Sequence, residues 1–232
     1  MTTVLLLRHG RTTANAEGVL AGWTPGVELD EVGRDQVEAV AKRLQEVRVR
    51  AVLTSPLERC RQTAEAIVQK HRRDLPVHTE VEFAECRYGD WTGQSLEVLA
   101  KDPLWDVIQR HPSSVTFPGG ESLVHMQARS IAAIRRWNIK LGPEATYVAV
   151  THGDVIKGIL ADALGMHLDL FQRIQVDPCS VSVVKYHAHG ISVARMNDVG
   201  GDLSMFSPVR KGGRSAKQAR SSGGMVGGET GA

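Results

Sequence analysis

The chain has 232 residues, of which 42% are hydrophobic and 23% are charged, and its formal net charge is +2. This composition is ordinary for a soluble globular protein, and no segment approaches the ~20 apolar residues that span a bilayer. The chain runs directly into a strand-like segment, so we expect no signal peptide. The three cysteines lie far apart without metal-type spacing, which predicts no disulfides and a reducing, cytoplasmic location.

The charge is divided unevenly along the chain. Residues 207–232 carry five basic side chains and one acidic side chain, so residues 1–206 carry a net charge of about −2. The last segment is rich in Gly and Ser and poor in apolar residues, which predicts a disordered basic tail. A nucleic-acid-binding protein carries its basic patch on the fold itself, so we expect no nucleic-acid partner.

Short apolar runs alternate with helical patterns from the N-terminus onward. Helices are predicted where apolar residues recur every three or four positions, and we expect Ser55 to cap one of them in a capping box with Glu58. Strands alternating with helices indicate an α/β fold with a mostly parallel sheet. The predicted strands are 4–7, 51–53, 76–81, 147–150, 181–186 and 190–196, and the predicted helices are 31–47, 55–71, 95–110, 121–141 and the segment after Gly153 to about Leu164.

Three predicted strands end in residues that can do chemistry. The first runs into Arg8-His9-Gly10, the second into Ser55 and then Arg59, and the strand 147–150 into His152-Gly153. Ligands of such sheets bind beyond the carboxyl ends of the strands, so these residues could meet at one edge. A single histidine at a strand end is more often structural than catalytic. The repeated strand-His-Gly pattern favours a site, because glycine permits close approach of a ligand.

Together these residues resemble the histidine phosphatase superfamily, the phosphoglycerate mutase-like group. The resemblance extends over residues 4 to about 197 and rests on several motifs in the family's order. Residues 8–12 (R-H-G-R-T) resemble the family's first motif, and residues 55–64 resemble the second, with Arg59 as its arginine. Residues 85–93 resemble the segment that carries the acidic catalyst, here Glu85, and residues 118–122 resemble a loop that opens a long helix. Residues 151–153 match the second histidine motif, and Asn15 and Gly22 fall where members have an asparagine and a glycine.

The resemblance implies a three-layer α/β/α sandwich with a mostly parallel central sheet over residues 1–206, in which 86–125 form a cap. It also implies phosphoryl transfer through a phosphohistidine on His9, with Glu85 as general acid rather than its neighbours Glu82 and Asp90. No cofactor or metal is expected, since the side chains supply the positive charge. The phosphate-binding residues implied are Arg8, His9, Asn15, Arg59, His152 and Gly153, and the two arginines should lower the pKa of His9.

The resemblance leaves the reaction open between three readings. Members that act as phosphoglycerate mutases carry a basic, aromatic run after the acidic catalyst, whereas residues 86–89 (C-R-Y-G) hold one arginine. We therefore predict a phosphomonoester hydrolase acting on a small phosphorylated metabolite. The alternatives are a mutase-type phosphotransferase and a catalytically idle phosphate-binding module. Members often form dimers, so a homodimer stays an open alternative.

Three residues depart from the family pattern. Many members have Glu or Gln in place of Arg11, which could add positive charge beside the phosphate or point to solvent. Asp154 suits the start of a helix, and a role in orienting His152 is a hypothesis. Thr92 replaces a common glutamate, so the substrate is not specified.

Overall fold

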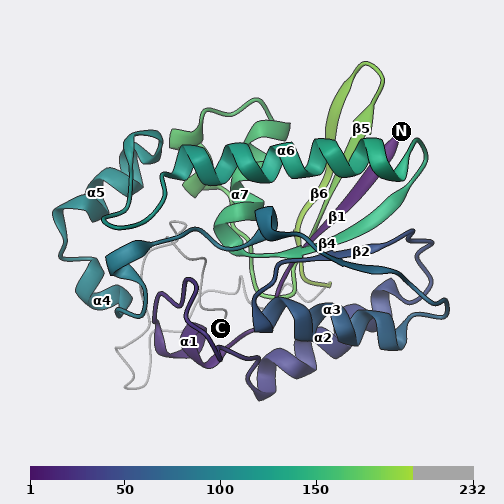
Figure 1. The fold of residues 1–232 in the computed structure, drawn as a ribbon, viewed down its shortest axis with the longest axis horizontal. Helices are drawn as coiled ribbons and strands as arrows, with labels where there is room; N and C mark the ends of the chain where they lie inside the picture. Colours follow the sequence, from purple (N-terminus) through teal and green to yellow (C-terminus); the bar gives the residue numbers. More distant parts are fainter. Residues whose placement is uncertain (201–232) are drawn as a thin grey trace, which may run out of the picture.

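The structure is a computed structural model that describes residues 1–200. The tail predicted over 207–232 lies outside the described residues. A six-stranded sheet in the order β3-β2-β4-β1-β5-β6 forms the centre (Figure 1). Its strands are β1 (Thr2–Arg8), β2 (Val52–Thr54), β3 (Val77–Thr79), β4 (Thr146–Thr151), β5 (Val181–His187) and β6 (Gly190–Asp198).

The sheet is mostly parallel, as predicted. β3, β2, β4 and β1 are parallel neighbours, and β5 and β6 follow as an antiparallel hairpin beside β1. β1 is paired on both edges and buried on both faces, which explains why residues 4–7 are a continuous apolar run rather than an alternating one.

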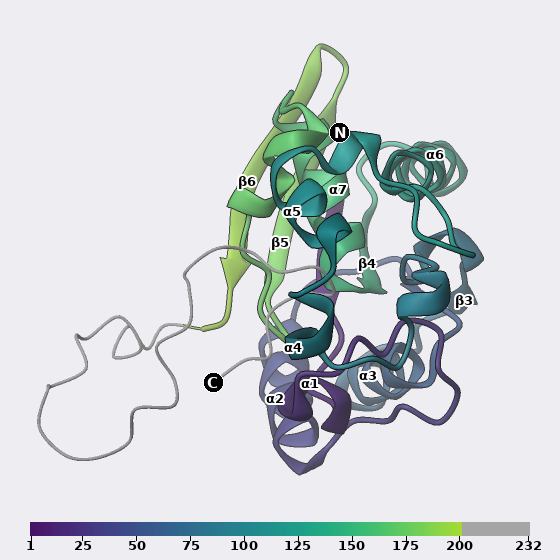
Figure 2. The same cartoon turned by 90° about the vertical axis from the view of Figure 1, so that its left-hand side faces the viewer.

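Helices cover both faces of the sheet. α2 (Glu31–Leu44) and α3 (Glu58–Lys70) pack on the face that includes Leu5 and Leu7. α6 (Leu123–Leu141) and α7 (Gly153–Ala163) pack on the face that includes Val4 and Leu6 (Figure 2). Because successive side chains of a strand point to opposite faces, one apolar run supplies both cores. The predicted three-layer α/β/α sandwich is confirmed.

The start of α3 differs from the prediction. The helix begins at Glu58, and Leu57 occupies its N-cap position without a side-chain hydrogen bond. The Ser55 hydroxyl lies instead 2.8 Å from His152 Nε2. The capping box predicted for Ser55 and Glu58 is therefore wrong.

The helix predicted over 95–110 is divided into α4 (Leu96–Leu99) and α5 (Pro103–Arg110). Proline lacks an N–H and favours the first turn of a helix, and the Asp102 side chain caps the second helix at Leu104 N–H. The remaining helical elements are short and had no clear pattern in the sequence. They are α1 (Thr13–Glu17) and the 3₁₀ turns η1 (Val81–Phe83), η2 (Gly89–Trp91), η3 (Pro112–Ser114) and η4 (Leu168–Arg173).

Residues 86–125 connect the sheet to α6 and include α4 and α5. Backbone hydrogen bonds join residues 93–96 to residues 18–20, beside α1 (Figures 1 and 2). Gly89 is required where this segment meets residues 118–120, because its φ is +54° and a Cβ would lie 2.0 Å from the Pro118 carbonyl oxygen. A cap function for 86–125 stays a prediction. Within residues 1–200, the helices are all too short or too polar to cross a membrane.

Candidate active site

The four parallel strands deliver the candidate residues to one edge of the sheet. His9 follows β1, and His152 lies between β4 and α7. Arg59 lies in the first turn of α3, after β2, and Glu85 follows β3 and η1. Because these strands are neighbours, their carboxyl ends meet, and the structure brings His9, Arg59, Glu85 and His152 together.

His9 is buried and held in one orientation. Its Nδ1 lies 2.7 Å from the Gly10 carbonyl oxygen, which can only accept, so Nδ1 carries the proton. Nε2 then has a free lone pair and accepts a hydrogen bond from Arg59 Nε at 3.2 Å. Burial, followed by the charges of Arg59 and Arg8, holds the pKa of His9 well below its ordinary value. The ring is a neutral base with its lone pair directed at the arginine.

His152 lies on the other side of the same guanidinium. Its ring centroid is 5.2 Å from that of His9, and its Nδ1 lies 3.3 Å from Arg59 Nη2. Nδ1 also lies 3.7 Å from Glu85 Oε2. Burial and then Arg59 hold the pKa of His152 well below its ordinary value, so the ring is neutral in the free protein.

Two buried arginines make the site electropositive. Arg59 Nη2 donates to the Gly22 carbonyl at 2.9 Å, whereas its buried Nη1 has no hydrogen-bond partner among the described residues. Arg8 is fully buried and donates through Nη1 to the Val176 carbonyl at 2.7 Å. A buried guanidinium donor without an acceptor is costly, so Arg59 Nη1 indicates a site for an oxyanion such as phosphate.

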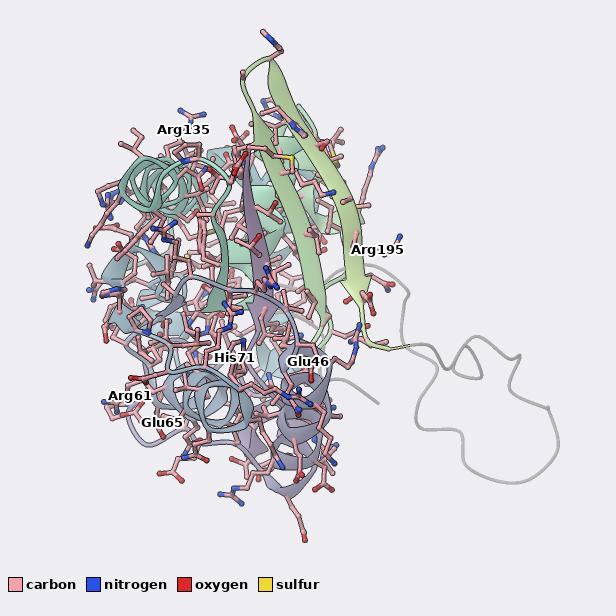
Figure 3. All side chains as sticks on the ribbon, turned by 90° about the vertical axis from the view of Figure 1, so that its right-hand side faces the viewer. Glu46, Arg61, Glu65, His71, Arg135 and Arg195 are labelled. Atoms are coloured by element: carbon pink, nitrogen blue, oxygen red, sulfur yellow. The ribbon has the colours of Figure 1, made fainter. Side chains whose placement is uncertain are left out.

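Arg59 owes its burial to its place on α3. Arg61, two residues further along, lies on the opposite side of the same helix and is exposed, as is Glu65 (Figure 3). Thr63 lies one turn after Arg59, where its hydroxyl accepts from the Gly10 N–H and so links α3 to the loop that follows His9.

Glu85 is the buried carboxyl group beside His152. Its Oε1 accepts the Cys86 N–H at 3.0 Å. Burial, reinforced by the negative charge of Asp154, raises the pKa of Glu85 to about 7, although Arg59 and Arg8 act in the opposite direction. Of the two competing carboxylates, Glu82 is half-buried and Asp90 is exposed. Glu85 alone of the three has the burial and the neighbours of a proton donor.

The segment that carries Glu85 is held by residues that sequence reasoning missed. Trp23 Nε1 donates to the Glu85 carbonyl at 2.7 Å. The Arg129 guanidinium donates to the carbonyls of residues 82, 84 and 85 and pairs with Glu121 at 2.7 Å. Arg129 lies in the middle of α6, where arginine is common on solvated faces, so no local pattern reveals it.

Asn15, predicted to bind phosphate, lies in α1 close after His9. Its Oδ1 accepts from both the Thr12 N–H and hydroxyl, which closes a capping box at the start of α1. Its phosphate contact stays a prediction, as does that of Gly153, the first residue of α7. Arg11 pairs with Asp30 at 2.8 Å, so an ion pair accounts for this departure from the family pattern.

Asp154 is fully buried in the first turn of α7. Its Oδ2 accepts from the Tyr88 hydroxyl at 2.8 Å, and its Oδ1 lies 3.8 Å from the Lys157 ammonium. Its negative charge acts on Glu85, as described above. Among residues 1–200, no three His, Cys, Asp or Glu side chains are grouped so that they could hold a metal ion.

A neutral imidazole with an available lone pair lies against buried arginines at the carboxyl edge of an α/β sheet, which is an arrangement suited to binding an oxyanion. The model of the histidine phosphatase superfamily (branch 1) matches residues 4–199. The chain belongs to this superfamily.

Several individual proteins are similar to the chain. A bifunctional protein of Mycobacterium tuberculosis is 33% identical over 201 residues, which cover 84% of this chain and 53% of that protein. The chain thus spans about half the length of that relative. Glucosyl-3-phosphoglycerate phosphatase of Mycolicibacterium vanbaalenii is 30% identical over 72% of this chain and 76% of the relative. The solved structure of Bacillus stearothermophilus YhfR has a TM-score of 0.80 and 28% identity, and covers 86% of this chain and 98% of that one.

Proposed function

We propose that the protein is a phosphomonoester hydrolase that acts through a phosphohistidine on a small phosphorylated metabolite. The observation that carries this proposal is the state of His9. Nδ1 is tied to a carbonyl oxygen, the pKa is low, and the Nε2 lone pair faces Arg59. A neutral, oriented imidazole is the form that can attack phosphorus.

In the first step His9 Nε2 forms a bond to phosphorus and the ester P–O bond breaks. Arg59 and Arg8 neutralise charge on the equatorial oxygens, so their contribution is electrostatic and present before the substrate arrives. Glu85 gives its proton to the leaving oxygen; a pKa of about 7 supports this role, because the acid is substantially protonated near neutral pH.

In the second step the same carboxylate, now ionised, takes a proton from water. The resulting hydroxide attacks phosphorus, the P–N bond breaks, and inorganic phosphate and neutral His9 are released. Glu85 is protonated again, so the cycle closes without a cofactor.

The relatives include both a glucosyl-3-phosphoglycerate phosphatase and a phosphoglycerate mutase. The choice between the two reactions therefore rests on the segment that follows Glu85, which favours hydrolysis. The position after Glu85 is Cys86, which is fully buried, and Arg87 is the single basic residue before Gly89. The segment after Glu85 therefore adds little positive charge to that of Arg8 and Arg59 for retaining a phosphorylated product for a second transfer.

The test is phosphate release from a panel of phosphomonoesters, including an aryl phosphate, by the full chain. His9→Ala should lower turnover by at least about 10³-fold, because loss of a nucleophile removes the covalent path. His189→Ala, at an exposed histidine of the β5–β6 turn, should keep wild-type turnover.

Other results would support the alternatives. Interconversion of phosphoglycerates without phosphate release would identify a mutase. Phosphate binding without any turnover would identify a binding module. Turnover in His9→Ala equal to that of the wild type would remove His9 as the nucleophile.

A further inference from the structure

The Ser55 hydroxyl, expected from the sequence to cap a helix, lies behind the second histidine of the site. Ser55 is fully buried, and its Oγ lies 2.8 Å from His152 Nε2. The other ring nitrogen, Nδ1, is the one that lies near Arg59 Nη2 and Glu85 Oε2. His152 is therefore contacted by a hydroxyl at one nitrogen and by the candidate phosphate site at the other.

The position of the single ring proton decides what His152 can do. The pKa of His152 is well below its ordinary value because of burial and Arg59, so the free protein holds a neutral ring. With the proton on Nδ1, the ring is a hydrogen-bond donor to a phosphoryl oxygen. With the proton on Nε2, it presents a lone pair that would repel that oxygen.

The contacts of Ser55 favour one direction for its proton. Its Oγ accepts the Leu57 N–H at 3.3 Å, so one lone pair is in use. The thiol of Cys60 lies beside the same ring nitrogen, with its Sγ 3.4 Å from His152 Nε2. It is a poor alternative acceptor for the Ser55 proton, because sulfur accepts weakly and the thiol faces the Thr151 carbonyl. Within residues 1–200, the imidazole Nε2 is thus the strongest acceptor that the Ser55 hydroxyl contacts.

Arg59 does not require the other tautomer, in which the proton is on Nε2 and Nδ1 accepts a hydrogen bond. Its Nη2 has the Gly22 carbonyl as an acceptor at 2.9 Å, closer than the 3.3 Å to His152 Nδ1. The Nδ1 lone pair is therefore not needed to satisfy this guanidinium.

We propose that Ser55 is a positioning residue whose hydroxyl donates to His152 Nε2 and so keeps the ring proton on Nδ1, facing the phosphoryl group. Its catalytic consequence rests on the proposed function, whereas the tautomer itself does not. The inference adds a role for a buried serine that acts only through the histidine beside it.

The tautomer is measured directly by ¹⁵N NMR of the full chain labelled at histidine, without substrate, with His152→Asn used to assign the signals. The wild type should show a protonated-type Nδ1 and an unprotonated Nε2 for His152. Ser55→Ala should shift the ring toward the Nε2–H form and lower kcat about tenfold to a hundredfold, since a misplaced donor costs at most what a deleted donor costs.

Thr54→Val is the matched control. It deletes the neighbouring buried hydroxyl, which donates to the Ser55 carbonyl and not to the ring. The control should keep the wild-type tautomer and kcat. If Ser55→Ala does not fold, Ser55→Cys, which keeps a weak donor of similar size, should give an intermediate tautomer population.

Three results would overturn the inference: an Nε2–H tautomer in the wild type, a doubly protonated His152 in the wild type, or an unchanged tautomer in Ser55→Ala or, failing that, in Ser55→Cys. A Ser55-dependent Nδ1–H form in a protein that hydrolyses no phosphomonoester would sustain the inference about Ser55 and reject the proposed function.

Discussion

At the scale of the residue, the pH dependence of hydrolysis should follow the proton on Glu85. Burial and the two arginines hold the pKa of His9 well below its ordinary value, whereas burial raises the pKa of Glu85 to about 7. The profile of kcat/KM against pH reports the free protein, so it should fall on the alkaline side with a midpoint of about 7. Above the midpoint, the rate should drop about tenfold per pH unit.

Asp154→Asn tests the cause of the fall in kcat/KM on the alkaline side, which we call the alkaline limb of the profile. Removing the negative charge lowers the pKa of Glu85, so the limb should move to lower pH. The profile is measured below the melting temperature, because the variant leaves Lys157 without its carboxylate. Asp162→Asn, on the same helix and near Arg135, is the control. Superimposable profiles for Asp154→Asn and the wild type would show that Asp154 does not set this pKa.

At the scale of the element, α6 supports the Glu85 segment through Arg129. Arg129→Gln leaves the carbonyls of residues 82 and 84 without a donor and the Glu121 carboxylate without its cation, whereas the Glu85 carbonyl keeps its hydrogen bond from Trp23. We expect a loss of about 3 kcal/mol in the free energy of unfolding, measured by urea denaturation, and a lower kcat.

Arg135→Gln is the control on the same helix. Arg135 projects from the outer side of α6 and is largely exposed (Figure 3). Its loss should cost less than about 0.5 kcal/mol. Equal losses of unfolding free energy in the two variants would mean that Arg129 contributes no more to stability than a surface arginine does.

The elements themselves were largely predictable, and the errors have local causes. Apolar periodicity located all six strands and the four longest helices. It misjudged the start of α3, because a serine before a proline looks like a cap whether its hydroxyl faces the helix or a histidine 97 residues away. It merged α4 with α5, because the apolar spacing continues across Pro103. The role of Arg129 could not be found, because the carbonyls that it contacts lie 44 to 47 residues away.

At the scale of the whole molecule, stability should depend on the protons held at the site. His9 and His152 have lowered pKa values, so their contribution to stability is present above pH 6.5 and is lost on acidification. Glu85 has a raised pKa, so its contribution is present below pH 4.5 and is lost as the pH rises through about 7. Between pH 4.5 and pH 6.5, unfolding therefore takes up protons at the two histidines and releases one proton at Glu85.

The free energy of unfolding should therefore fall as the pH drops from about 6 to 5. In Glu85→Gln the opposing proton is absent, so the free energy of unfolding should fall more steeply with decreasing pH. Urea denaturation across this pH range measures both slopes. An unchanged slope in Glu85→Gln would mean that Glu85 does not hold its proton in the folded state.

The sequence motifs predicted which residues converge, but not the order of the strands that brings them together. β1 pairs with β4 and β5, whose residues begin at 146 and 181, and no local pattern encodes such distant pairing. The mostly parallel sheet followed from the alternation of strands and helices, whereas the side-chain contacts of Ser55, Trp23 and Asp154 depend on packing between layers.

That pairing has a consequence for synthesis of the protein. Thr3 is in register with Thr146 on one side and with Lys185 on the other, so neither partner strand exists when β1 leaves the ribosome. At a synthesis rate of about 5–20 residues per second, the apolar run of β1 has no partner strand for on the order of ten seconds. The nascent chain is exposed to aggregation during that interval, and the candidate active site cannot assemble until about three quarters of the described residues have been synthesised.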